Sequence, residues 1–121
     1  MIKVSVSGSY KNLKQSLGII AKIEFRMKLK KWATAGVQAL EKATPKDTGL
    51  TAKSWRYEIR EDATGTIIDW HNDNISKGTP VAIFIQYGHV TMNGSFVDGV
   101  DYINPALQPI FKEITTYLNR M

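Results

Sequence analysis

The chain has 121 residues, 43% of them hydrophobic, which is enough for one domain with its own core but too short for two conventional domains. It contains no cysteine, which excludes disulfides, thiol catalysis and thiolate-bound zinc, and no run approaches the roughly 20 apolar residues of a membrane span. We therefore expect a single domain over residues 1–121. Neither secretion nor membrane insertion is expected, because the N-terminus alternates instead of forming the apolar block of a signal peptide.

The formal net charge is +5, and it is concentrated in residues 9–43, which hold eight Lys/Arg against two Glu. A basic segment of this kind can meet phosphate or an acidic protein surface. Lysine-rich helix faces, however, are most often simply solvated. The charge alone therefore does not identify nucleic acid as the partner.

The N-terminal third is predicted to be a short strand followed by a long helix. Apolar residues alternate from Ile2 to Val6, and Gly8 ends that pattern. Residues 9–43 contain no proline and consist mostly of good helix formers, so they predict one helix that stops before Pro45. Its apolar residues lie on two nearly opposite faces, so either the segment breaks into two helices or its halves pack against different bodies, such as a neighbouring subunit. One face holds Leu13, Leu17, Ile20 and Met27, and the other holds Phe25, Leu29, Trp32, Gly36 and Leu40.

The middle of the chain is predicted to be mainly strands. Residues 44–49 have turn chemistry. Residues 55–60 and 66–71 alternate apolar and polar side chains, and we expect them to pair as a hairpin. Residues 72–80 are polar and predict a loop. Residues 81–87 are apolar on both faces, which predicts a strand inside the sheet or beneath a helix.

The C-terminal third is predicted to be a loop followed by a helix. Residues 88–101 contain three glycines and no long apolar run, which predicts an extended loop, either a binding segment or plain surface. Asn104 is a suitable helix cap, Pro105 suits the first helical position, and Pro109 is expected to delay or bend the first turns. The apolar spacing of three and four predicts an amphipathic helix through Leu107, Ile110, Phe111, Ile114 and Leu118. The predicted class is α+β: a long N-terminal helix and a C-terminal amphipathic helix packed on a small, mainly antiparallel sheet.

One group of residues has the chemistry of a metal site. Asp69, His71 and Asp73 alternate, so on an extended strand they would share a face and could bind a divalent cation. We favour the simpler interpretation of a strand running into a polar loop, because no further carboxylate or histidine motif accompanies them. The signatures GxSxG, GxxxxGK[ST] and HExxH are missing, so no catalytic residue, cofactor or metal is expected. The tryptophans are expected to be core residues rather than platforms for bases.

Three segments, taken in order, resemble a known family. Thr44-Pro45-Lys46-Asp47-Thr48-Gly49-Leu50, followed by Ser54-Trp55, resembles a Thr-Pro-x-Asp-Thr-Gly segment that leads from a long helix into the first sheet strand. Ala82-Ile83-Phe84-Ile85-Gln86-Tyr87-Gly88 is similar to a strand end with an aromatic-Gly pair, and Asp101-Tyr102-Ile103-Asn104-Pro105-Ala106-Leu107 to a Pro-Phe-Leu-x-Pro-Ala-Leu helix start. The family is that of the tail-completion or head-to-tail joining proteins of long-tailed double-stranded DNA phages and prophages. The likeness spans roughly residues 10–118, with departures at Gln86, Asp101 and Tyr102-Ile103.

The resemblance implies a structural, non-enzymatic virion protein, assembled in the bacterial host cytoplasm, that completes the tail end or neck and joins tail to filled head. It implies a homo-oligomeric ring of about six subunits with repeated heterologous contacts. The other implied partners are the tail tube or tail terminator and the head connector proteins; contact with DNA is possible but not required, and no membrane is involved. Thr48 and Gly49 are expected to serve the turn first. The expected interface residues are Lys28, Lys30, Lys31, Asp47, Thr48, Gly49, His89, Asn93, Phe96 and Asp98.

Two other functions remain open at this point. The basic segment is compatible with a nucleic-acid-binding module, whose affinity for DNA would fall steeply with salt. A metal-dependent enzyme at Asp69, His71 and Asp73 is a more distant alternative, and it would have to bind manganese or zinc.

Overall fold

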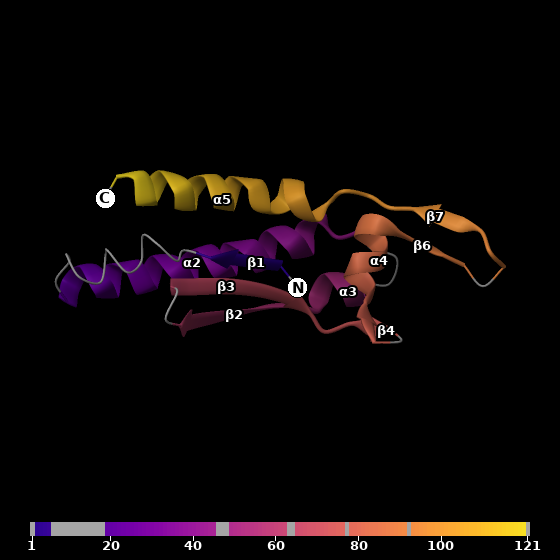
Figure 1. Cartoon of the computed structure of the whole chain (residues 1–121), viewed down its shortest axis with the longest axis horizontal. Helices are drawn as coiled ribbons and strands as arrows, with labels where there is room; N and C mark the ends of the chain where they lie inside the picture. Colours follow the sequence, from indigo (N-terminus) through magenta and orange to yellow (C-terminus); the bar gives the residue numbers. More distant parts are fainter. Residues whose placement is uncertain are drawn as a thin grey trace.

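The computed structural model describes residues 2–5, 19–45, 49–62, 65–76, 78–91 and 93–120. It has the expected α+β class, with helix α2 between helix α5 and an antiparallel sheet (Figure 1). In chain order the elements are β1 Ile2–Ser5, α2 Ile19–Ala43, α3 Leu50–Lys53, β2 Trp55–Asp62, β3 Gly65–Asn72, β4 Ile75–Ser76, β5 Thr79–Pro80, α4 Val81–Tyr87, β6 Gly88–Val90, β7 Phe96–Asp98 and α5 Ile103–Asn119.

Helix α2 confirms the predicted helix over the residues that are described. It ends at Ala43, because Pro45 disfavours helical angles in the residue before it. Its core side is the predicted one and buries Phe25, Leu29, Trp32 and Leu40. Met27, on the opposite predicted face, is exposed. Residues 9–18, with Leu13 and Leu17, and the side chain of Ile20 lie outside the described residues.

The three-stranded sheet has the order β1-β3-β2 and is antiparallel throughout. The strands predicted at 55–60 and 66–71 and their hairpin are confirmed, and so is the N-terminal strand over its described residues 2–5; Val6 lies outside the described residues. Trp70 stands opposite Tyr57 in the register, and its indole nitrogen donates to the carbonyl oxygen of Ala33 at 3.0 Å, which ties the sheet to α2. The tryptophans are core residues as predicted, and Trp55 donates to Thr44 Oγ1 at 2.9 Å.

The strand predicted at residues 81–87 is wrong: this segment is the helix α4. A short run that is apolar on both faces does not distinguish a buried strand from a buried helix. Pro80 precedes the helix in an extended conformation, and Gly88 ends it at φ 85°. Ala82 and Gln86, four residues apart, share the buried side, whereas Tyr87 is exposed.

The loop predicted at residues 88–101 is also wrong in part, because it contains the two-stranded hairpin β6–β7, in which Val90 pairs with Phe96. The missed signal is Asn93-Gly94, the dipeptide that favours tight hairpin turns. Thr91 N donates to Ser95 O at 2.7 Å across this turn. The hairpin projects beyond the other elements at one end of the molecule (Figure 1).

Helix α5 confirms the predicted amphipathic helix but begins at Ile103, one residue before the expected cap at Asn104. Its start is capped from another element, because Gln86 Oε1 accepts the N–H groups of Tyr102 at 3.0 Å and Ile103 at 2.9 Å. Pro105 lies in the first turn, where no helical hydrogen bond is lost. Pro109 is inside the helix. The buried side is the predicted one, with Ile103, Leu107, Ile110 and Ile114.

Gly49 adopts a left-handed conformation, with φ 80°, between α2 and α3. No described atom lies within 4 Å of the position where a Cβ would be. The cost of adding a side chain at this position is therefore the strain of the left-handed backbone alone. We expect Gly49→Val to lower the free energy of unfolding by about 1–2 kcal/mol in urea denaturation. Gly49→Asn is the control and should cost less, because asparagine tolerates this conformation; equal losses would contradict the explanation.

Tyr102 connects α5 to α4 through its phenol, which donates to Ala82 O at 2.9 Å. Burial raises the pKa of this phenol to about 12, from an ordinary value of 10.0. The folded-state pKa is the higher one, so this stabilising contribution is complete below pH 10 and is lost as the pH rises towards 12. We expect up to about 2 kcal/mol to be lost over this interval, measured by urea unfolding at each pH. Tyr102→Phe has no phenol to ionise and should show a flatter profile; matching profiles would contradict the prediction.

Candidate interaction surface

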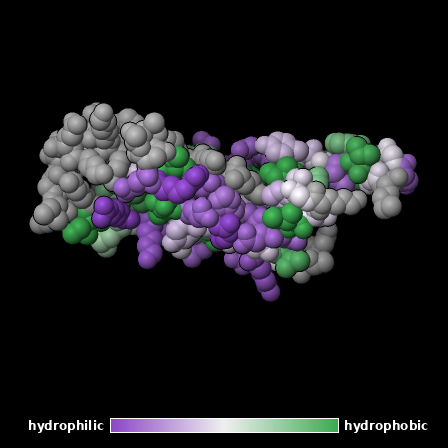
Figure 2. All heavy atoms as spheres, turned by 60° about the horizontal axis from the view of Figure 1, so that its bottom comes forward, coloured by the Kyte–Doolittle hydropathy of each residue, from purple (hydrophilic) through white to green (hydrophobic). Residues whose placement is uncertain are grey.

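The hairpin end of the molecule exposes several large apolar side chains. Their exposed fractions lie between 44% and 68%. Hydrophobic residues gather at this end, on the right of Figure 2. We call this group the hairpin surface; it consists of Tyr87, Val90, Phe96, Val97 and Val100. Side chains of this size exposed together are typical of a protein contact, because scattered single residues would need no such explanation.

The hairpin is held firmly at its base. Val100 N donates to Ile85 O at 2.9 Å, so the chain returns to α4 directly after β7. Gly88 and Gly99 make this close approach possible, since a Cβ on either residue would collide with backbone atoms of the opposite segment. The hairpin surface is therefore presented in one orientation by the backbone beneath it.

A groove of about 680 Å³ opens beside the hairpin base. Its walls come from three parts of the chain and include Gly49, Phe84, Ile85 and His89. The Phe84 and His89 rings are 5.8 Å apart. Opposite them, α3 is fixed to the strand end by Asn72 Nδ2, which donates to Thr51 O at 2.8 Å.

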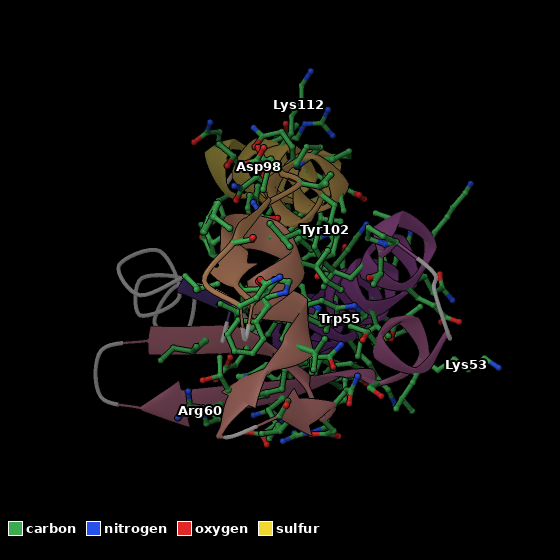
Figure 3. All side chains as sticks on the ribbon, turned by 90° about the vertical axis from the view of Figure 1, so that its right-hand side faces the viewer. Lys53, Trp55, Arg60, Asp98, Tyr102 and Lys112 are labelled. Carbon is green, nitrogen blue, oxygen red and sulfur yellow. The ribbon has the colours of Figure 1, made fainter. Side chains whose placement is uncertain are left out.

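The structure divides the expected interface residues into separate surfaces. His89, Asn93, Phe96 and Asp98 all lie on the β6–β7 hairpin, and Gly49 shares the groove with His89. Viewed from the hairpin end, Asp98 lies in front of α5, whereas the buried Trp55 and Tyr102 lie among the other elements (Figure 3). Asp47 and Thr48 lie outside the described residues. Lys28, Lys30 and Lys31 are on α2, away from the hairpin.

The three lysines do not act as one cluster. Lys28 is directed toward α5, with its Nζ 5.9 Å from the centre of the Tyr117 ring. Lys30 and Lys31 instead line a shallow open surface along α2, which we call the α2 stripe; it consists of Met27, Lys30, Lys31, Thr34, Ala35 and Gln38. The spacing of three and four is that of one helix face. Ile23, 53% exposed, continues this face toward the N-terminus, where Met27 is 68% exposed.

No family model, curated protein or solved structure matches this chain. None of the described helices is long and apolar enough to cross a membrane.

The structure brings together two of the three possible metal ligands. Asp69 is buried and its Oδ2 lies 3.1 Å from the Arg60 guanidinium and 3.2 Å from His71 Nε2. Asp73 lies beyond the end of β3 and pairs with Arg56 at 2.8 Å. Within the described ranges, no three His, Asp or Glu side chains are arranged to hold a metal ion. Both carboxylates are instead paired with arginines, Asp69 with Arg60 and Asp73 with Arg56.

Sequence reasoning missed most of the hairpin surface. Tyr87, Val90, Val97 and Val100 were not among the expected interface residues, and neither were the exposed Leu50 and Ile75. The available signal was the pair of short apolar runs on either side of Asn93-Gly94. That pattern predicts a hairpin, but it does not tell whether the apolar side chains are covered.

Proposed function

We propose that this chain is a structural assembly protein of a phage or prophage virion, which completes the tail end or neck and joins the tail to the filled head as a ring of about six subunits. The observation that carries the proposal is the hairpin surface: a firmly based, projecting hairpin whose large apolar side chains have no partner within the described part of the chain. The ordered motifs between residues 44 and 107 supply the family context.

Such a protein would act through surfaces that are complementary to those of its partners. Ring subunits need one surface that meets a different surface on the next copy, and further surface for the tail and head proteins. The hairpin surface, the groove and the α2 stripe are three distinct candidates on this chain. The proposed role requires no catalytic group, cofactor or membrane contact.

The proposal is tested by deleting the gene from the phage that encodes it. The expected result is heads that package DNA but do not become joined, infectious particles. The wild-type chain supplied in trans should restore infectivity, whereas a V90S/F96S chain should not, although its thermal stability should be close to that of the wild type because both side chains are exposed. I75S is the control, since Ile75 is similarly exposed but lies on β4. Normal infectivity of the deletion phage would overturn the proposal.

A nucleic-acid-binding module remains the second candidate, because Lys30 and Lys31 are exposed on an open helix face. This function predicts DNA binding that weakens steeply with rising salt, as counterions are released from the phosphates. Titration of a labelled duplex by fluorescence anisotropy measures this directly. Lack of binding at about 50 mM salt would remove the candidate.

A further inference from the structure

We propose that the hairpin surface of one subunit docks on the α2 stripe of the next copy of the same chain. The inference rests on the proposed ring and adds which two surfaces form its repeated contact. In this contact, the expected interface residues on the hairpin lie on one side of the interface. Lys30 and Lys31 of the next copy lie on the other side.

The two surfaces have opposite charge. Residues 88–101 carry Asp98 and Asp101 and no lysine or arginine. The α2 stripe carries Lys30 and Lys31 and no acidic residue. Opposite charges at the rim of a contact steer the two surfaces together and reject like-charged alternatives. Each surface is therefore better matched to the other than to a second copy of itself.

Both surfaces also offer apolar area beside their charges. Met27 and Ile23 are more than half exposed on α2, and Val90 and Phe96, which pair across β6 and β7 and therefore share one face of the hairpin, are the corresponding apolar groups. Burying such side chains against one another supplies the favourable free energy that exposed ion pairs lack. The pattern of apolar residues flanked by charge is that of an interface core with a polar rim.

The α2 stripe is long enough to receive the paired part of the hairpin. From Met27 to Gln38 the stripe covers eleven helical steps, or about 17 Å at the helical rise. The paired arms of the hairpin, Gly88–Val90 and Phe96–Asp98, each cover two extended steps, or about 7 Å. The paired arms would therefore fit within the length of the stripe.

The two surfaces lie at different places on the molecule, so their contact is heterologous. The hairpin projects at one end, beyond the C-terminal end of α2, and the stripe lies further back along that helix (Figure 1). The hairpin base is fixed to α4, which prevents the hairpin from folding back onto its own α2. Head-to-tail contacts of this type produce closed rings when the rotation between copies closes.

The natural absence of cysteine allows a direct test by disulfide trapping. T34C places a thiol on the stripe and V90C places one on the hairpin face that carries Phe96, both at exposed positions. Mixing the two single variants under mild oxidation should give a covalent heterodimer at least about tenfold faster than either variant alone gives a homodimer, because docking raises the effective thiol concentration. The double variant T34C/V90C should give a ladder of covalent oligomers. V90C mixed with K112C is the matched control, because Lys112 is exposed on α5 and points away from the body (Figure 3).

Each outcome of this test has a definite meaning. Equal trapping of T34C and K112C by V90C, or no trapping at all, overturns the inference, and rapid V90C homodimers would instead indicate a symmetric hairpin contact. Adding K30E/K31E to T34C should slow trapping, and an unchanged rate would also count against it. If trapping succeeds but the deletion phage is infectious, the contact stands and the proposed function fails. If trapping fails while the deletion phage assembles no joined particles, the function stands and this contact fails.

Discussion

Gly36→Val should lower the free energy of unfolding by about 2–4 kcal/mol, since overpacking a core typically costs 1–3 kcal/mol and the loss of a buried hydrogen bond adds about 1. A Cβ at Gly36 would lie 2.5 Å from three atoms of the Trp70 indole ring. That ring is fully buried and donates to Ala33 O, so it has no free space into which to move. Urea denaturation followed by tryptophan fluorescence measures the change.

The matched control is Gln38→Val, on the same helix but exposed. It makes the same valine substitution without an overlying ring, so it should change stability by only a few tenths of a kcal/mol. Gly36→Ala should fall between the two, because its single methyl group already meets the indole. A G36V protein as stable as the wild type would mean that α2 and β3 separate more easily than their packing indicates.

Gln86→Leu is the second substitution with a large expected effect, about 2–4 kcal/mol of stability, because it leaves two buried N–H groups unsatisfied at about 1–3 kcal/mol each. The Gln86 oxygen accepts from the backbones of Tyr102 and Ile103, and its amide nitrogen donates to Asp101 Oδ1 at 2.7 Å. Leucine fills a similar volume but accepts no hydrogen bond. Thermal unfolding should detect the loss, and hydrogen exchange should localise it to the first turn of α5.

Asp101→Asn is the control for Gln86→Leu, because it removes the charge from the exposed partner and leaves both backbone contacts intact. Its cost should be below about 1 kcal/mol, as for other exposed polar groups. If Q86L and D101N were equally destabilising, the cap of α5 would not be the source of the effect.

Local signals predicted the elements whose patterns have only one explanation. Pro45 marks the end of α2, and the alternation on either side of residues 62–65 marks the β2–β3 pair. Residues 81–87 were predicted wrongly because a seven-residue apolar run fits either a strand or a helix, and tertiary packing, not β propensity, decides between them. The cap of α5 was also beyond local reasoning, since its acceptor, Gln86, lies on another helix.

The candidate surfaces were predictable only in part. His89, Asn93, Phe96 and Asp98 were selected because they lie in a glycine-containing segment, and the structure places them on one hairpin. Periodicity cannot reveal that the neighbouring valines remain exposed, because exposure depends on what the rest of the chain fails to cover. Likewise, the basic residues of α2 divide between two faces only when α5 is in place, with Tyr117 beside Lys28.

Because the base of the hairpin is closed, residues 89–98 form a segment that can be replaced by another sequence. Ile85 and Val100 are joined by a backbone hydrogen bond, so the two ends of this segment keep the same separation whatever lies between them. Loop length adds only slowly to the entropy of closure. We therefore expect that hairpins of other lengths and sequences can be grafted at this position without moving α4 or α5, so that the surface presented at this end changes while the fold stays the same.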